Sequence, residues 1–144
     1  MQLTRSGEYG IRGILYLALQ SPERLTSLEA IAQAQDVPKN LLAKVMQNLA
    51  KAGIVRSQRG AGGGFALARP ASAITLLQVI QGVEGPLYLN RCLIRRGECP
   101  YDQICPVHKV WRRAQEALVA ILGGTTIAKL VEEAPYSLRK GESR

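Results

Sequence analysis

The chain has 144 residues, 47% of them hydrophobic, and a formal net charge of +8 at pH 7. This length fits one domain with an extension, and no stretch is typical of a secretory leader or apolar for long enough to cross a membrane, which disfavours exported and membrane-spanning proteins. The positive charge predicts a polyanionic partner, with nucleic acid ahead of a membrane surface, and the three cysteines indicate the reducing cytoplasm.

The first part of the chain predicts three helices. Residues 2–20 carry apolar side chains at helical spacing. Thr26 and Glu29 have the spacing of a capping box, with Thr26 as the cap, and so predict a short helix that ends near Gln35. A tight turn follows, and a longer helix is expected over 38–51. A short helix, a tight turn and a longer helix are typical of a helix-turn-helix.

The second helix of this pair is expected to have an apolar face and a polar face. The polar face would consist of Lys39, Asn40, Ala43, Lys44 and Gln47. Because a major groove accepts a helix, Lys39 and Asn40 are candidates for reading base edges, and Lys44 for contacting phosphate. An ordinary solvated face would have a similar composition.

A hairpin, or wing, is predicted next. Two short strand candidates flank a glycine-rich tip: residues 54–58 and 65–69 around 59–64. Gly60 and Gly62 would let the backbone approach DNA closely, and Arg59 could enter a minor groove. The alternative is a flexible loop; a Walker phosphate loop is excluded, because no Gly-Lys-Ser/Thr follows. Residues 37–69 hold six basic and no acidic side chains, as a DNA-binding surface would.

The second half predicts further helices. They are a short helix that starts over 75–80 and is closed by Gly82 and Gly85-Pro86, a long helix over 106–122, and a last helix over 127–131 capped by Thr125-Thr126. The long helix has more apolar surface than a lone terminal helix should expose, which favours a dimerisation helix over packing on its own domain. A two-fold dimer would bind a palindromic operator on double-stranded DNA.

These elements predict a mainly α fold with a small β-hairpin wing. We expect a winged helix-turn-helix domain over residues 1–85 and a loop over 86–105. A dimerisation helix and a C-terminal helix are expected over 106–134, and a flexible tail over 135–144.

All three cysteines and the single histidine lie close together in the sequence. Cys92, Cys99, Cys105 and His108 fall in one segment, whose first part is interrupted by glycine and proline and is therefore expected to be a loop. Three soft thiolates and an imidazole can converge on one soft metal centre. Pro106 suits the first position of a helix, which would place Cys105 at the helix start with His108 on the same face.

An iron–sulfur cluster is the favoured interpretation of this segment. A structural Cys3His zinc site is the second metal alternative, although zinc ligands are usually paired through closer steps. The cysteines could also be redox thiols, with one left over, or simply buried apolar side chains.

The whole pattern resembles the IscR and NsrR group of iron–sulfur-dependent winged-helix transcription regulators. The resemblance rests on the first ten residues, on Arg-Gly-Ala-Gly-Gly-Gly-Phe in the wing, on the three cysteines, and on His108 followed by Trp111. It implies a homodimer that binds DNA and senses iron–sulfur status, nitric oxide or redox state.

The resemblance also implies a ligand set. In IscR-like members a 2Fe-2S cluster is held by three cysteines and a histidine placed like Cys92, Cys99, Cys105 and His108. In NsrR-like members a 4Fe-4S cluster takes an acidic residue from the partner's first helix, a place that Glu8 could fill here. This chain departs from the group twice: six rather than five residues separate the first two cysteines, and Ala43 replaces the acidic residue that IscR carries in its reading helix.

The sequence therefore predicts a cytoplasmic, homodimeric transcription regulator modulated by an iron–sulfur cluster, with 2Fe-2S favoured over 4Fe-4S. The alternatives are a regulator without a cluster that senses thiol oxidation or binds zinc, and an iron–sulfur electron-transfer or carrier protein. An enzyme is disfavoured, because with the single histidine in a ligand position no histidine-based triad remains.

Overall fold

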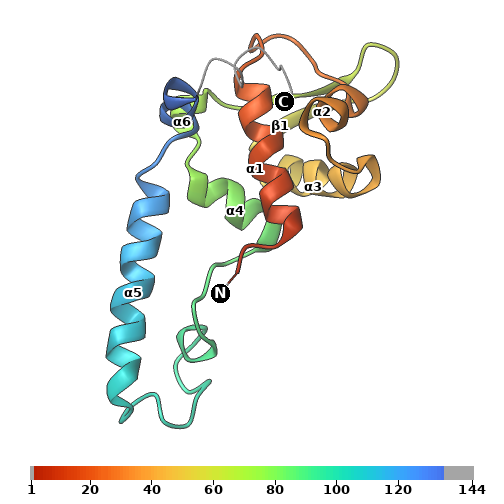
Figure 1. Ribbon diagram of the computed structural model, residues 1–144. Helices are drawn as coiled ribbons and strands as arrows, with labels where there is room; N and C mark the ends of the chain where they lie inside the picture. The colour runs from red at the N-terminus through yellow and green to blue at the C-terminus, as the bar shows by residue number, and fades with distance from the viewer. Residues whose placement is uncertain (1, 135–144) are drawn as a thin grey trace.

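Helix α1 (Arg5–Ala18) runs through the centre of the molecule, and the other elements are arranged around it (Figure 1). The structure is a computed structural model that describes residues 2–134. Its other elements are α2 (Leu28–Gln35), α3 (Lys39–Lys51), β1 (Val55–Gln58), β2 (Gly64–Leu67), α4 (Leu76–Glu84), α5 (Pro106–Gly123) and α6 (Ile127–Glu133), with single 3-10 turns at η1 (Ala71–Ala73) and η2 (Arg91–Leu93). The predicted fold class, mainly α with one small hairpin, is confirmed.

The core lies where α1, α2, α3, α4 and α6 meet. Apolar side chains at helical spacing point inward from each of these helices and are fully buried: Ile14, Ile31, Leu42, Met46, Leu49, Val79 and Ile127. Helix α1 also comes very close to α4, since a Cβ on Gly10 would lie 2.7 Å from the Val83 side chain. The burial of these apolar side chains holds α4 firmly against the helix-turn-helix.

The helix-turn-helix of α2 and α3 is present as predicted, but its cap is a different residue. Ser27, not Thr26, precedes α2, and its side chain accepts a hydrogen bond from the Ala30 N–H at 3.1 Å. Thr26 instead pairs with Phe65 of β2 in an isolated antiparallel bridge. The prediction of Thr26 as the cap was wrong because pairing with a distant strand took its backbone.

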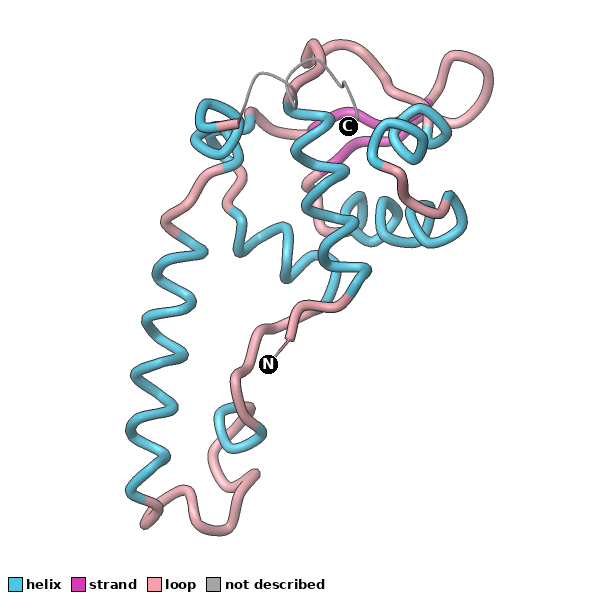
Figure 2. The backbone as a smooth tube through the Cα atoms, in the orientation of Figure 1, coloured by secondary structure: helices cyan, strands magenta, loops and turns pink. Residues whose placement is uncertain are grey.

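Strands β1 and β2 form the predicted wing. They pair antiparallel from Val55 opposite Leu67 to Gln58 opposite Gly64, and the loop between them extends away from the body (Figure 2). The Thr26 bridge adds backbone hydrogen bonds of 2.8 and 2.9 Å between Thr26 and Phe65. The base of the wing is thereby fixed to the start of α2.

Helix α4 runs past Gly82, the first glycine predicted to close it, and ends at the second, Gly85. Thr75 and Gln78 form a complete capping box at its start. Gly82 does not close the helix because it packs against the core, where an added Cβ would lie 3.1 Å from the Ile54 side chain. The glycine serves close packing there rather than a turn.

The segment between α4 and α5, followed by α5 itself, projects from the body as a separate arm (Figures 1 and 2). Helix α5 begins at Pro106 and has a single buried residue, His108. Helix α6 then returns to the body, where the Ile127 N–H donates to the Ile74 carbonyl at 2.9 Å. The predicted flexible tail, 135–144, lies outside the described residues. Within 2–134, no helix is both long and apolar enough to span a bilayer.

Candidate nucleic-acid interface and cysteine loop

The outward face of α3 is built as the sequence predicts. Its apolar side chains pack into the core, so that Lys39, Asn40 and Lys44 are exposed, while Ala43 is half-buried. One apolar residue, Leu41, is also exposed on this helix. The first turn of α3 thus presents an ammonium group and an amide, which are groups that can bind base edges and phosphates.

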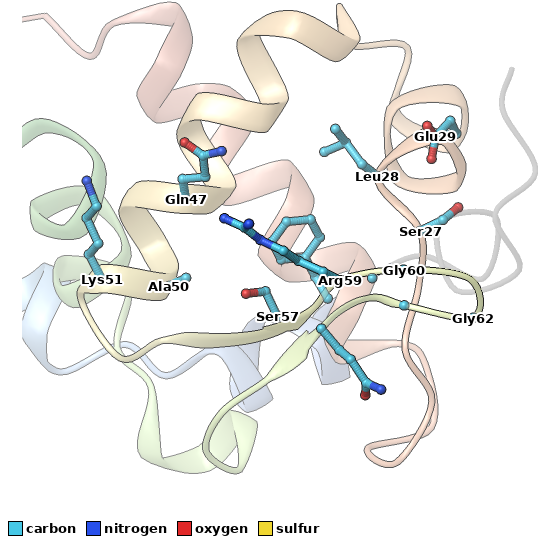
Figure 3. Close-up of a pocket in the computed structure, with 14 residues that line it drawn as sticks. Ser27, Leu28, Glu29, Gln47, Ala50, Lys51, Ser57, Arg59, Gly60 and Gly62 are labelled. Atoms are coloured by element: carbon cyan, nitrogen blue, oxygen red, sulfur yellow. The ribbon is translucent and has the colours of Figure 1, made fainter.

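The wing tip and α3 both border one cavity, whose volume is about 640 Å³. Arg59, Gly60 and Gly62 are exposed along its edge. Figure 3 shows the Arg59 side chain reaching from the wing toward α3, with Gln47 on the facing turn of the helix. Of the polar face predicted for α3, only Gln47 borders this opening together with the wing residues, whereas Lys39, Asn40, Ala43 and Lys44 do not line it.

The structure also places an acidic residue at this surface. Glu29, from the first turn of α2, makes an ion pair with Lys39 and borders the cavity. The hydrogen bond from Lys39 is the main cause that lowers the pKa of the Glu29 carboxyl below its ordinary value of 4.5. The sequence pattern did not predict this pair, because Glu29 lies outside the basic stretch 37–69 and has the spacing of a capping box with Thr26.

The three cysteines are free thiols and half-buried, and they lie on three parts of the arm. Cys92 lies in η2, Cys99 in the following turn, and Cys105 at the position preceding α5. Cys92 borders two cavities, one shared with Cys99 and another, of about 580 Å³, shared with His108.

His108 has the environment of a side chain with an unused donor or acceptor. Its residue surface is only 9% exposed, and its Nε2 lies 3.1 Å from the Arg112 guanidinium. Its buried Nδ1 has no hydrogen-bond partner among the described residues. An unpaired buried ring nitrogen is energetically costly, and a soft metal centre is one group that would satisfy it.

The loop is held by its own polar contacts and by α5. The Gly97 N–H donates to Asp102 Oδ2 at 2.6 Å, and this bond is the main cause that lowers the pKa of the Asp102 carboxyl. Arg95 Nε donates to Glu98 at 2.7 Å. At the loop's start, the Leu89 N–H donates to the Gln115 side chain at 2.9 Å, which ties the segment to α5.

The candidate ligands fit an iron–sulfur centre in kind, although the described conformation does not gather them around a point. Thiolates with an imidazole are established ligands of such centres. Within residues 2–134, however, no three His, Cys, Asp or Glu side chains lie close enough together to hold one metal ion. Glu8, the alternative ligand, is exposed in the first turn of α1. Binding a cluster would therefore require the loop to close, as metal-coupled ordering allows.

Helix α5 leaves a row of apolar side chains uncovered. Val107, Val110, Trp111 and Ile121 are exposed, with Ile121 at 67%. Helix α5 is in contact with α4 at one end and with η2 at the other. Large apolar surface in such a continuous row is typical of a protein–protein interface.

Comparison with known proteins identifies the family. The model of the Rrf2 family, described as iron-dependent transcriptional regulators, matches residues 3–133. Protein aau3 of Rhizobium meliloti (strain 1021) is 36% identical over 137 residues, which cover 94% of this chain and 88% of that protein.

Two solved structures are similar over nearly the whole chain. CymR (YrzC), the global cysteine regulator of B. subtilis, has a TM-score of 0.76 and 30% identity and covers 94% of this chain and 99% of its own. IscR of T. potens has a TM-score of 0.75 and 26% identity, and the match covers 100% of this chain and 93% of the IscR chain. The expected resemblance is confirmed at the level of the family, and the family is one of regulators rather than enzymes. The chain belongs to the Rrf2 family of DNA-binding transcriptional regulators.

Proposed function

We propose that this regulator is a cytoplasmic homodimer whose DNA binding is modulated by an iron–sulfur cluster. The observation that carries the proposal is the concentration of three free cysteines and the buried, unsatisfied His108 in one arm of the molecule. The candidate DNA-reading residues lie on α3 and the wing, away from that arm (Figure 1). The sensing part, residues 86–105, would thus be separate from the reading domain, residues 1–85.

The proposed DNA contacts come from α3 and the wing, through Lys39, Asn40, Ala43, Lys44, Arg59, Gly60 and Gly62. Lys39 and Asn40 would reach base edges in the major groove, and Lys44 would contact phosphate. Arg59 would enter the adjacent minor groove, where the narrow, negatively charged space favours a guanidinium. The exposure of Lys39, Asn40 and Lys44 on α3, and of Arg59, Gly60 and Gly62 on the wing, supports these roles.

We propose that residues 106–134 supply the dimer contact. The exposed apolar row on α5 would pair with the same row of a second chain, because an isologous contact places identical patches together. Two reading helices would then meet successive turns of the major groove, and the preferred operator would be palindromic double-stranded DNA.

The cluster would be held by Cys92, Cys99, Cys105 and His108. We favour a 2Fe-2S centre with His108 as the fourth ligand, since its Nδ1 is buried and finds no hydrogen-bond partner within residues 2–134. A 4Fe-4S centre with Glu8 of the partner subunit is the alternative. When bound, such a centre supplies one-electron redox chemistry whose potential depends on ligands and solvent exposure.

Helix α4 gives the arm a direct connection to the reading domain. It packs against both α1 and α3, and it leads straight into the cysteine loop. At its end, the Glu84 carboxylate accepts a hydrogen bond of 2.7 Å from the Thr4 N–H, just before α1. A change in loop conformation would therefore alter the position of α4 and with it the relative pose of the two reading helices.

The test is anaerobic purification from iron-replete cells, followed by absorption and Mössbauer spectra and analysis of iron and sulfide. We expect a coloured protein that loses its colour on Cys99→Ala, and an operator affinity that changes when the cluster is removed. His108→Ala should alter the spectrum if His108 is a ligand, and Glu8→Gln should alter it if Glu8 is. A colourless, iron-free protein under these conditions would contradict cluster sensing and leave DNA binding intact.

A second candidate is a regulator without a cluster that responds to thiol oxidation. It is favoured by the similarity to CymR, a global cysteine regulator, and by the separation of the three thiols in the described conformation. This candidate predicts that metal-free protein binds its operator and that oxidation of Cys92 with a neighbouring thiol changes the affinity. Mass spectrometry of the oxidised protein, with operator binding before and after reduction, distinguishes the two candidates.

A further inference from the structure

A carboxylate lies at the edge of the cationic surface that α3 and the wing form. Glu29 is the second residue of α2 and pairs with Lys39, the first residue of α3. Glu29 also borders the cavity that contains Arg59 and Lys51 (Figure 3). The partner of Glu29 is therefore one of the two side chains proposed to reach base edges.

This pair is not needed to hold the two helices together. The two side chains are 63% and 54% exposed, and exposed ion pairs contribute little to stability because water and salt screen them. The start of α2 is already capped by Ser27, and α2 and α3 pack through buried Ile31 and Leu42. The charge of Glu29 lies in the first turn of α2, where it favours the helix modestly, but its ion pair with Lys39 adds little to the stability of the fold.

On a surface that faces DNA, an acidic side chain acts against general binding. Non-specific binding to a duplex is almost entirely the attraction of cations to phosphates. A carboxylate that holds Lys39 competes with phosphate for the same ammonium group, whatever the base sequence. A base edge with acceptor atoms in the right place, such as the major-groove edge of guanine, offers Lys39 a geometrically defined alternative.

We propose that Glu29 is a specificity-determining residue of the DNA-reading surface: its carboxylate opposes the approach of phosphates to Lys39 on arbitrary sequences, whereas the paired ammonium keeps spare N–H donors for the neutral acceptor atoms of operator base edges. The proposal rests on the DNA interface proposed above. Specificity gained by weakening the wrong complexes is a common property of selective interfaces. Each phosphate contact contributes about 0.9 to the slope of log affinity against log salt concentration. If the contribution of a contact is taken as zero at 1 M salt, withholding one contact lowers the non-specific affinity about eight-fold at 0.1 M salt.

The test compares Glu29→Gln with Glu133→Gln. Both changes remove one negative charge, but Glu133 lies on α6, on the far side of α1 from α2 (Figure 1). Fluorescence anisotropy over a salt series measures the affinity of the full-length protein for two duplexes. One is an operator selected in vitro from a random library by the wild-type protein, and the other is a scrambled duplex of the same length and composition.

We expect Glu29→Gln to raise the affinity for the scrambled duplex by up to about eight-fold at 0.1 M salt and to steepen its salt slope by about 0.9. The gain on the operator should be clearly smaller, so that the ratio of the two affinities falls. Glu133→Gln should change both affinities little and equally. Thermal unfolding should show that both variants are folded at the assay temperature, with Glu29→Gln less stable by no more than about 1 kcal/mol because it loses a negative charge from the first turn of α2.

A double-mutant cycle tests whether Glu29 acts through Lys39. In a Lys39→Met background, Glu29→Gln should affect the scrambled duplex no more than Glu133→Gln does. The proposal is overturned if Glu29→Gln raises both affinities equally, if its effect equals that of Glu133→Gln, or if the effect persists without Lys39. If the wild-type protein selects no operator and binds no duplex, the proposed DNA interface itself fails, which is a separate result.

Discussion

Gly64 fixes the wing to the helix-turn-helix, and its replacement by alanine should be severely destabilising. The residue has φ +150, a conformation that side chains with a Cβ rarely adopt. An added Cβ would lie 2.3 Å from the carbonyl oxygen of Thr26 and 2.5 Å from its carbonyl carbon. Both atoms are backbone, so the strain cannot be relieved by a rotamer change.

The expected cost follows from these contacts. The unfavourable φ costs about 1–3 kcal/mol. The two backbone hydrogen bonds between Thr26 and Phe65 would be lost as the strand moves away, at about 0.5–1.5 kcal/mol each. Gly64→Ala should therefore reduce the free energy of unfolding by about 4 kcal/mol.

Gly53→Ala is the matched control. Gly53 also has a positive φ, +76, but nothing lies within 4 Å of its added Cβ. Its replacement should cost about 1–2 kcal/mol, the left-handed conformation alone. Urea unfolding followed by circular dichroism measures both variants. Gly64→Ala should also weaken operator binding more than Gly53→Ala at a temperature where both are folded. Equal destabilisation by the two substitutions would refute the inferred contact between β2 and Thr26.

Three further predictions follow from named contacts. Ser27→Ala should lower the free energy of unfolding by about 1 kcal/mol, because it removes the cap of α2. Thr26→Val should be close to neutral, because the buried Thr26 hydroxyl has no partner among the described residues. Urea unfolding of both variants measures these changes, and a larger loss for Thr26→Val would mean that Thr26 is the cap. Ile121→Lys should leave the fold intact and convert the proposed dimer into a monomer, because it places a charge in the exposed apolar row of α5. Analytical ultracentrifugation measures this change. A dimer that persists in the variant would mean that the interface lies elsewhere. Lys39 lowers the pKa of Glu29, so the contribution of their pair to folding stability is complete above pH 4.5 and is lost as the pH falls through the lower folded-state pKa. In an NMR titration of the Glu29 carboxyl group, Lys39→Met should move the midpoint up toward 4.5. An unmoved midpoint would mean that the ion pair does not form in solution.

Local patterns in the sequence predicted much of the reading domain correctly. The apolar residues Leu42, Val45, Met46 and Leu49 recur at helical spacing and are all buried on α3. Such spacing is a property of the neighbouring residues alone, so it can be read without knowledge of the fold. The hairpin was equally predictable, because its glycine-rich tip lies between two short strand candidates.

The errors occurred where a distant segment competed with a local pattern. Thr26 and Glu29 have the spacing of a capping box, but Thr26 pairs with Phe65 and Glu29 with Lys39. Gly82 resembles a helix end, but it lies inside α4 where Ile54 requires a small residue. In each case, packing against another element overrode the local preference.

The sequence by itself determined the chemical groups available and their local order: a basic stretch on a helix-turn-helix and wing, and three thiols with one imidazole in a single segment. These features depend only on residue type and on short spacings along the chain. The tertiary structure alone decided which groups meet, namely Glu29 with Lys39 and Gly64 with Thr26, and that Cys92 borders one cavity with Cys99 and another with His108. These contacts arise when helices and strands from distant parts of the chain bury their apolar faces against one another, and the polar groups at their edges are brought together as a consequence.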